Sequence, residues 1–206
     1  MNTIVLTDDG GYAMVGVTYP TGIMNADIVF VKLDSDGRVE FSRSYSGPRQ
    51  DNGLGIVQEP DGSFVIGGWT RPEKLRSGHD LLLMKIDSGG KIIWAKGYDS
   101  TKYPSSTFGE ETAYFMEYPE KGKHMRNSYD SFSLLNTDDH GFAITALISR
   151  KDNVIALKTD DKGDVECVRT KGVEEGGWGY TRYASDYYGL TIDQNSSGEY
   201  MMSYFK

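Results

Sequence analysis

Internal disulfides and membrane-spanning helices are excluded by what the sequence lacks. The chain of 206 residues has one cysteine, Cys167, so no internal disulfide can form. No segment approaches the ~18 consecutive apolar residues that a membrane-spanning helix needs. The first residues, MNTIVLTDDGG, lack the basic and apolar regions of a signal peptide. Neither absence identifies the compartment, because many secreted proteins also lack disulfides.

Clusters of basic residues are also missing. The formal net charge is −8, and acidic and basic residues are interspersed along the chain. A nucleic-acid surface needs a basic stripe, and a surface that docks on anionic lipid needs basic clusters. The charge pattern therefore argues against both kinds of partner.

Signals for catalysis, metals and cofactors are few. There is no phosphate-binding GxxxxGK[ST] loop and no dinucleotide fingerprint. The three histidines, His79, His124 and His140, do not have the short spacing of zinc ligands. Glu110–Glu111 or Glu174–Glu175 could serve a hydrolase or lyase, but adjacent carboxylates rarely converge on one bond. We expect no metal and no cofactor, and we favour a non-enzymatic role over an enzymatic one.

Glycine and tyrosine are abundant, at 25 and 14 residues, which is typical of a chain rich in turns and strands. A first motif occurs four times, as IVLTDDGGYAMVGVT, IVQEPDGSFVIGGWT, LLNTDDHGFAITALI and IDQNSSGEYMMSYFK. The third copy has His140 where the others have glycine, and histidine tolerates the positive φ that such a turn needs better than most residues.

A second motif follows the first in three of the four copies: DIVFVKLDSDGRVEFSRSYSG, DLLLMKIDSGGKIIWAKGYD and NVIALKTDDKGDVECVRTKG. Its lysine (Lys32, Lys85 and Lys158) is expected to pair locally, with its alkyl stem over apolar surface and its charge reaching water. The DSDG of the first copy resembles a calcium loop, but Gly89 and Lys162 replace Asp36 in the other copies. Its conserved pattern of aspartate and glycine predicts a hairpin turn instead.

Each full repeat predicts four short antiparallel strands, near Ile4 to Thr7, Tyr12 to Thr18, Asp27 to Leu33 and Arg38 to Tyr45 in the first copy. The third strand is apolar on both faces, as expected for a sheet covered on both sides. A small residue in the second strand, at Gly16, Gly68 and Ala146, predicts close approach between sheets. The aligned Phe41, Trp94 and Cys167 are expected in the core, so Cys167 is interpreted as a buried, inert thiol.

These motifs resemble the β-propeller-type repeats of bacterial and archaeal proteins, with the pattern SDGGY-IVAGYT…D-YLIKLDSNG-V-WSKTYGG. The resemblance covers nearly the whole chain, most loosely in the third repeat. It implies an all-β fold of propeller-type blades with four antiparallel strands each, about three and a half blades in this chain. Many such proteins lie on the cell surface, so the resemblance favours an extracellular location.

The repeats are expected near residues 3–53, 54–131 and 132–189, with a half repeat at 190–206, in one domain over 1–206. Three and a half blades leave an open strand edge, which natural proteins avoid. Three explanations stay open: a fragment of a longer protein, a second chain that completes the sheet, or a half blade that folds back. The first two predict that the isolated chain does not persist as a stable monomer.

Two long loops follow the fourth strand of repeats two and three, and connecting loops often carry function. They span 99–131 and 173–189 and are rich in aromatic residues. Such residues suit a protein partner or self-association, and, as a second possibility, the apolar faces of a glycan. Equally, they could plug the loops against the sheet edges. The candidate binding residues are Tyr103, Tyr114, Tyr118, Trp178, Tyr180, Tyr183, Tyr187 and Tyr188.

Overall fold

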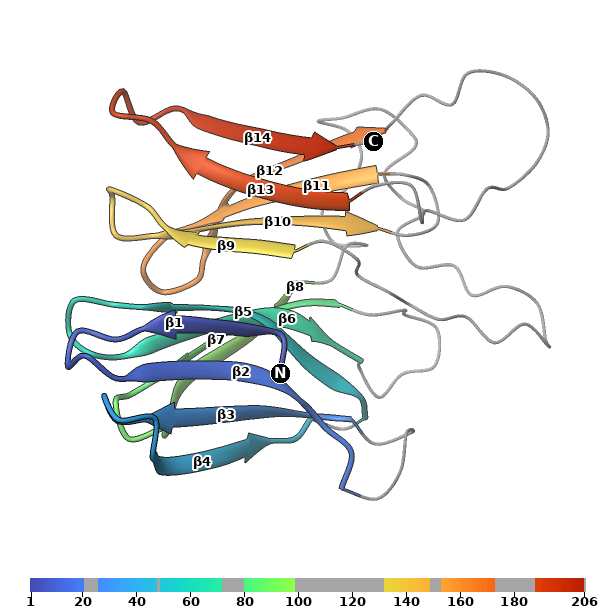
Figure 1. The fold of residues 1–206 in the computed structure, drawn as a ribbon. Coiled ribbons are helices and arrows are strands. Elements are labelled where there is room, and N and C mark those ends of the chain that lie inside the picture. Colours follow the sequence, from blue (N-terminus) through green and yellow to red (C-terminus); the bar gives the residue numbers. More distant parts are fainter. Residues whose placement is uncertain are drawn as a thin grey trace, which may run out of the picture. The chain divides into compact units, whose positions relative to one another are not determined.

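The computed structural model describes residues 1–20, 26–47, 49–71, 80–98, 132–148, 153–172 and 188–205. All regular secondary structure in these ranges is β-strand (Figure 1). The strands are β1 (Thr3–Leu6), β2 (Tyr12–Thr18), β3 (Asp27–Leu33), β4 (Val39–Tyr45), β5 (Asp51–Gln58), β6 (Phe64–Thr70), β7 (Asp80–Ile86), β8 (Ile92–Tyr98), β9 (Phe132–Asn136), β10 (Phe142–Ile148), β11 (Asn153–Thr159), β12 (Val165–Gly172), β13 (Tyr188–Gln194) and β14 (Tyr200–Phe205).

The strands form three four-stranded antiparallel sheets and one two-stranded sheet. Each four-stranded sheet is a simple meander, in the orders β1-β2-β3-β4, β5-β6-β7-β8 and β9-β10-β11-β12, and β13 pairs with β14. The predicted all-β class and the antiparallel four-strand repeat are confirmed. β2 and β3 have the predicted bounds, whereas β5 begins at Asp51, ahead of the expected repeat boundary at 54.

Aspartate and glycine shape the turn between the third and fourth strands. Asp34 Oδ1 accepts the backbone N–H groups of Asp36, at 2.9 Å, and Arg38, at 2.8 Å. The aligned residues Asp87 and Asp160 accept the same pair of N–H groups in their turns, and Asn195 does so in the turn between β13 and β14. The glycine of each turn has a positive φ, as does His140 at 66°. The hairpin interpretation of DSDG and the prediction for His140 are confirmed.

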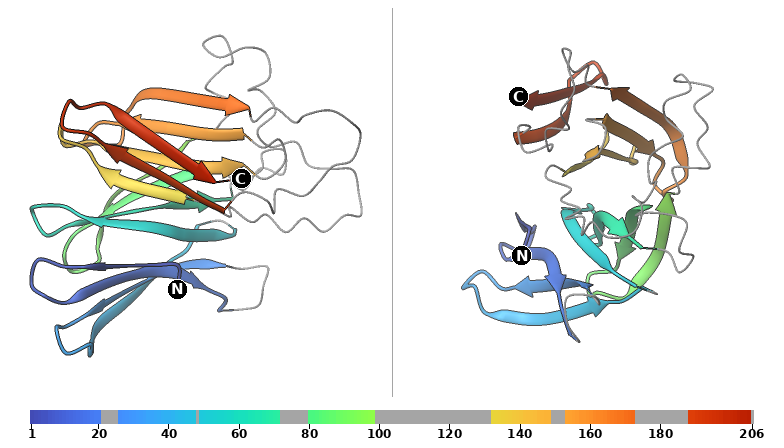
Figure 2. Two further views of the ribbon diagram at one scale, coloured as in Figure 1. Left: turned by 45° about the horizontal axis from the view of Figure 1, so that its top comes forward. Right: turned by 90° about the vertical axis from the view of Figure 1, so that its right-hand side faces the viewer.

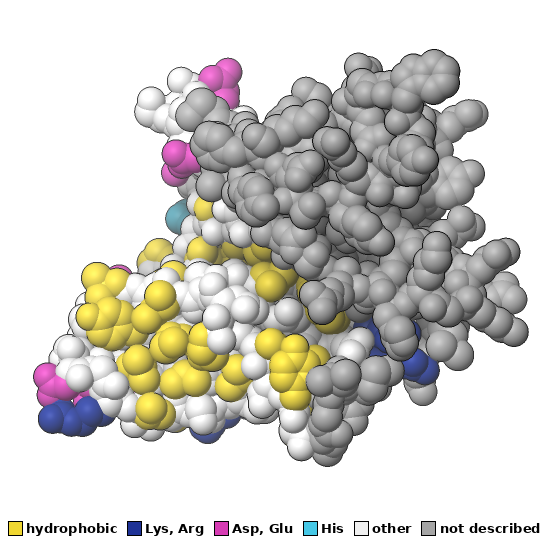
Figure 3. All heavy atoms as spheres, turned by 45° about the vertical axis from the view of Figure 1, so that its right-hand side comes forward, with side chains coloured by type: hydrophobic (Ala, Val, Ile, Leu, Met, Phe, Trp, Pro, Cys, Tyr) yellow, Lys and Arg dark blue, Asp and Glu magenta, His cyan; other side chains and the backbone are white. Residues whose placement is uncertain are grey.

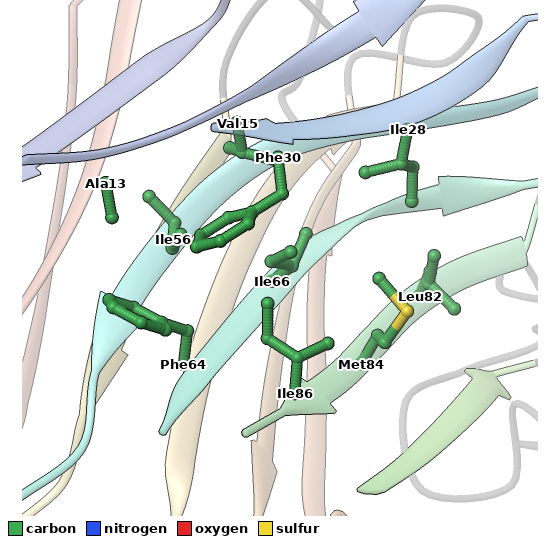
Figure 4. Close-up of a cluster of buried hydrophobic side chains, with 10 residues drawn as sticks. All are labelled: Ala13, Val15, Ile28, Phe30, Ile56, Phe64, Ile66, Leu82, Met84 and Ile86. Atoms are coloured by element: carbon green, nitrogen blue, oxygen red, sulfur yellow. The ribbon is translucent and has the colours of Figure 1, made fainter. Parts of the chain in front are cut away.

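The chain divides into two compact units, one with β1 to β8 and one with β9 to β14, and each is described by itself. In the first unit the sheet β1–β4 stacks on the sheet β5–β8 (Figure 2). Figure 4 shows their shared core, in which Phe30 and Val15 point toward Ile56 and Ile66. The Phe30 ring lies 5.3 Å from the Phe64 ring. Each fully buried side chain of this size stabilises the fold by about 1.5–3 kcal/mol.

The two sheets approach each other closely at Gly53. A Cβ added there would lie 2.4 Å from Val15 Cγ2 and 3.1 Å from Ile28 Cγ2, both of the opposite sheet. The interpretation of Gly68 as the contact point between sheets is wrong. A Cβ at Gly68 would instead meet the Asn52 carbonyl oxygen at 1.9 Å, within its own sheet. The small residue there accommodates the irregular pairing of β5 with β6, where the register shifts between Gly53 and Gly55.

One hydrogen bond recurs between stacked elements in both units. In the first unit Gln58 Oε1, at the end of β5, accepts the Asp8 backbone N–H at 2.9 Å. In the second unit Gln194 Oε1, at the end of β13, accepts the Asp138 backbone N–H at 2.9 Å. Gln58 and Gln194 occupy the same repeat position, as do Asp8 and Asp138. The glutamine of one repeat therefore fixes the turn of the repeat before it.

The close approach at Gly53 makes a specific prediction. Gly53→Ala should lower the free energy of unfolding by about 1–3 kcal/mol, because Val15 must move to admit the new methyl group. Gly97→Ala is the matched control, since a Cβ there would find its nearest neighbour at 3.8 Å, an ordinary contact. Urea denaturation of both variants measures the difference. Equal stability of the two variants would contradict the assignment of the sheet contact to Gly53.

Candidate functional site

The aromatic loop residues cannot be placed as a site. Seven of the eight candidate binding residues, Tyr103, Tyr114, Tyr118, Trp178, Tyr180, Tyr183 and Tyr187, lie outside the described residues. Tyr188 begins β13, and only its backbone is described. The loop glutamates, His79 and His124 also lie outside. Binding of a protein or glycan through these loops stays a prediction.

In the first repeat the lysine is buried and bridges two hairpins of its sheet. Lys32 is 5% exposed, on the face of β3 that carries Ile28 and Phe30. Its Nζ lies 2.8 Å from Asp9 in the first turn and 3.1 Å from Glu40 in β4. It also donates to the Leu33 carbonyl oxygen at 3.0 Å. Two carboxylates and a carbonyl thus replace the water that the buried ammonium group loses.

A β-bulge brings the second carboxylate to this lysine. In β3 and β4, Lys32 pairs with Phe41 and Leu33 pairs with Val39, so Glu40 is the extra residue. A bulge can redirect a side chain, which here reaches Lys32. In the third repeat Lys158 lies 3.0 Å from Asp139 and 2.8 Å from Glu166, which is again the bulge residue.

The second repeat compensates its lysine differently. Its bulge residue is Ile93, which cannot pair with Lys85. Lys85 Nζ instead lies 3.8 Å from Glu59 and 3.7 Å from Asp61. Glu59 occupies the position of Thr7 and Thr137 in the other repeats. The second carboxylate has therefore moved from the fourth strand to the end of the first strand.

The expectation that these lysines pair locally holds for Glu40 and Glu166, which lie on the other arm of the same hairpin. It misses the partners in the first hairpin turn, which antiparallel pairing brings beside the end of the third strand. The expectation that the charge reaches water is wrong for Lys32, which is buried. Burial lowers the pKa of Lys32, but its hydrogen bonds to Asp9 and Glu40 outweigh burial and raise it. The Lys32 ammonium group likewise holds the pKa of Asp9 well below its usual range. Because these charges are paired, removal of one partner would leave a poorly hydrated charge uncompensated and would destabilise the fold.

Cys167 is half-buried, as are the aligned Phe41 and Trp94, so the prediction of a buried thiol is wrong. These residues pair with the lysine of the third strand, near the rim of each sheet. Phe41 packs against the core from there. Within the described ranges, no three His, Cys, Asp or Glu side chains are grouped as a metal would need.

The outer side of the first sheet is largely apolar and is not covered by the second sheet. On the side away from β5–β8, cross-strand pairing aligns Leu6, Tyr12, Leu33 and Val39 in one row. The next row holds Ile4, Met14, Val31 and Ser42, and a third holds Gly16, Val29 and Ser44. We name the apolar members of these rows the β1–β4 outer face: Ile4, Leu6, Tyr12, Met14, Val29, Val31, Leu33 and Val39.

Side chains of the β1–β4 outer face are exposed to an unusual degree. Leu6 is 69%, Val39 64% and Ile4 54% exposed, and the other members are half-buried. Figure 3 shows hydrophobic side chains gathered over this sheet. The equivalent face of the second sheet, with Phe64 and Met84, is buried in the shared core. The prediction that both faces of the third strand are covered thus holds for β7 and fails for β3.

The comparisons with known proteins do not name the family. No protein-family model matches the chain, and no curated protein matches it. Membership of the β-propeller-type repeat family therefore remains a proposal. Among the described residues there is no helix long and apolar enough to cross a membrane.

In the second repeat Glu59 takes the role that Glu40 and Glu166 have in the other repeats. This can be tested by moving the carboxylate from position 59 to the bulge position 93. Glu59→Thr should destabilise the protein by about 1–3 kcal/mol, because Lys85 keeps one carboxylate instead of two. Adding Ile93→Glu to that variant should restore most of the loss, since the bulge would direct the new carboxylate at Lys85. Chemical denaturation of the single and double variants measures this coupling. A double variant no more stable than Glu59→Thr would refute the exchange.

The second unit provides a pH test. Hydrogen bonds from Thr137 and Lys158 lower the pKa of Asp139 to about 2, from 3.8. A carboxylate with a lowered folded-state pKa stabilises the protein above pH 4, and this stability is lost as pH falls toward 2. Asp139→Asn should cost about 0.5–1 kcal/mol at pH 7, because the group is largely exposed, and should flatten the pH dependence between 4 and 2.

The control is Asp138→Asn, since Asp138 makes no ion pair among the residues described. Denaturation curves at several pH values compare the two variants. An Asp139→Asn protein with the same acid sensitivity as the unaltered chain would contradict the role of the Asp139–Lys158 pair.

Proposed function

We propose that this chain is a non-enzymatic binding or assembly module built from propeller-type blades, and that the β1–β4 outer face is its contact surface. The carrying observation is an apolar face on which Leu6, Val39 and Ile4 are each more than half exposed. Contiguous exposed apolar patches on soluble proteins commonly mark sites of interaction. The four-stranded sheets and their repeated turns support the propeller-type interpretation.

Comparison with the second repeat indicates that this kind of face is normally covered. Tyr12, Met14, Val31 and Leu33 align with Phe64, Ile66, Met84 and Ile86 of the second repeat. The latter four are buried against the first sheet. The equivalent apolar face of β1–β4 contributes the same favourable free energy, ~25 cal/mol per Å2 of buried apolar area, only when another surface covers it.

Lysines whose charges are paired within their own sheet suit a structural role. The lysine of each four-stranded sheet is held by carboxylates of its own sheet, so the inner side needs no ligand for its charge. The partner would then bind the apolar outer face, and the paired charges would hold the sheet that carries this face. The loop aromatics and the open edge of β14 are further surfaces that the sequence favours.

The proposal is tested by recovering binding partners from the native source with matched variants. Leu6→Gln with Val39→Gln makes the outer face polar and should abolish recovery of the partner that the unaltered chain retains. Ile92→Gln is the control, because Ile92 has the repeat position of Val39 in the second sheet. It is also exposed, at 45%. Equal recovery by all three proteins would count against the outer face as the contact surface.

A further inference from the structure

We infer that the partner of the β1–β4 outer face is the inner side of a four-stranded repeat sheet of another protein, and that the DSDG turn, residues 34–37, is part of the contact. The inner side of such a sheet is the one that carries Val15, Phe30 and Lys32 in β1–β4. The inference rests on the proposed function, since it names the partner of the same site.

The contact between the two sheets of the first unit is the first argument. The side of β5–β8 that corresponds to the outer face, with Phe64, Ile66 and Met84, is covered by the inner side of β1–β4 (Figure 4). In this chain an outer side therefore packs on an inner side and not on another outer side. The same kind of cover for the β1–β4 outer face is the inner side of one more sheet.

The turn between the third and fourth strands is the second argument. In the second sheet the turn glycine, Gly90, is buried. A Cβ added there would lie 2.9 Å from Arg43 Cγ and 3.2 Å from both Phe41 Cε2 and Tyr45 Oη. The Tyr45 hydroxyl also donates to the Gly90 carbonyl oxygen at 2.8 Å. We name Phe41, Arg43 and Tyr45 the β4 socket. Gly37, the equivalent glycine of DSDG, is exposed, and a Cβ there would have no neighbour within 4 Å.

Charge complementarity supports a socket of the same kind in the partner. Burial raises the pKa of Tyr45 to about 12, Arg43 lowers it and Asp87 raises it, so both charged groups lie near the Tyr45 hydroxyl. Asp34 opens the first turn as Asp87 opens the second. A basic residue at the position of Arg43 in the partner would therefore lie near Asp34.

Met1 adds a requirement for the partner. Its side chain and amino group lie over Gly16 on the outer side, at the repeat position of Gly53. Within this chain Gly53 lies against Val15, with no space for a side chain. A partner that faces Met1 therefore needs a residue smaller than valine at the position of Val15. The second repeat has glycine there, Gly67, so the repeat pattern permits this choice.

The carboxylate on the outer side is compatible with a covering sheet. Asp27 lies on that side at the start of β3. Asp80 has the same position in β7, on the side that carries Leu82 and Met84. That side is covered by the first sheet. A charge at this position therefore does not prevent sheets from stacking.

A second copy of this chain offers no such sheet within the described ranges. The inner side of β1–β4 is covered by β5–β8. The inner side of β5–β8 is buried, since Val65 and Leu83 are 0% exposed. The third sheet lacks the socket, because Cys167 has the position of the aromatic residue and Lys171 that of the tyrosine. The partner sheet therefore belongs to a different protein, with an aromatic residue, a basic residue and a tyrosine at alternate positions of its fourth strand.

Recovery of partners by the full chain, with matched glycine variants, tests this inference. Gly37→Asn should weaken binding at least 10-fold, because asparagine tolerates a positive φ but its side chain would collide with the socket. Gly10→Asn is the control and should bind normally, since Gly10 also has a positive φ, at 80°, and open space around it. Its equivalent in the second sheet, Gly62, also has no neighbour within 4 Å of an added Cβ.

The recovered protein is identified by mass spectrometry and then purified for binding measurements. We expect its sequence to contain the aromatic, basic and tyrosine positions of a socket strand. Changing that tyrosine to phenylalanine should weaken binding about 3–10-fold, since the hydrogen bond to the Gly37 carbonyl oxygen is lost. Circular dichroism checks that each variant is folded, and Gly37→Asp replaces Gly37→Asn if that protein does not fold.

Two outcomes overturn the inference and leave the binding function in place. One is a protein that is recovered through Leu6 and Val39 but contains no socket strand. The other is a Gly37→Asn chain that binds this protein as tightly as the unaltered chain does. Recovery of no protein, or equal recovery by the outer-face variant Leu6→Gln with Val39→Gln, overturns both this inference and the proposed function.

Discussion

A lysine ammonium group held by two carboxylates is the interaction common to all three four-stranded sheets. In the first and third repeats the carboxylates come from two hairpins, and in the second both come from the first hairpin. A charge with so little exposure is tolerated only when ionic partners and a carbonyl surround it. In the first repeat this requires Asp9 in one turn and Glu40 at the bulge of the other hairpin, both near Lys32. The turn geometry, the bulge and the register of β2, β3 and β4 must therefore agree for the sheet to form.

The same constraint separates the two sides of the sheet. The side that carries Lys32 also carries Val15 and Phe30, and it is closed by the next sheet. That sheet comes within reach because Gly53 has no side chain. The other side carries no buried lysine, and its rows from β1 to β4 are mostly apolar. The proposal that the outer face is a contact surface follows from that difference between the sides.

Much of the fold could be predicted from the sequence. The repeats, the all-β class, the bounds of β2 and β3 and the positive φ of His140 follow from local patterns of glycine, aspartate and alternating apolar residues. The partners of Lys32 could not be predicted, because the strand ladder brings Asp9 to it from 23 positions away (32 − 9). One signal was available in the sequence. Glu40 and Glu166 share a repeat position at which the second repeat has Ile93, and only the second repeat has a glutamate, Glu59, at the position of Thr7 and Thr137.

The sequence by itself determined where strands and turns lie, since these depend on residues close together in the chain. It also showed that the third strand is apolar on both faces. Only the tertiary structure decided that Gly53 is the close contact between sheets and that the β1–β4 outer face stays exposed. Val29 in β3 and Leu82 in β7 are both apolar, yet Leu82 is buried and Val29 is partly open. The difference lies in which surface packs against each sheet, and that depends on residues distant in the sequence.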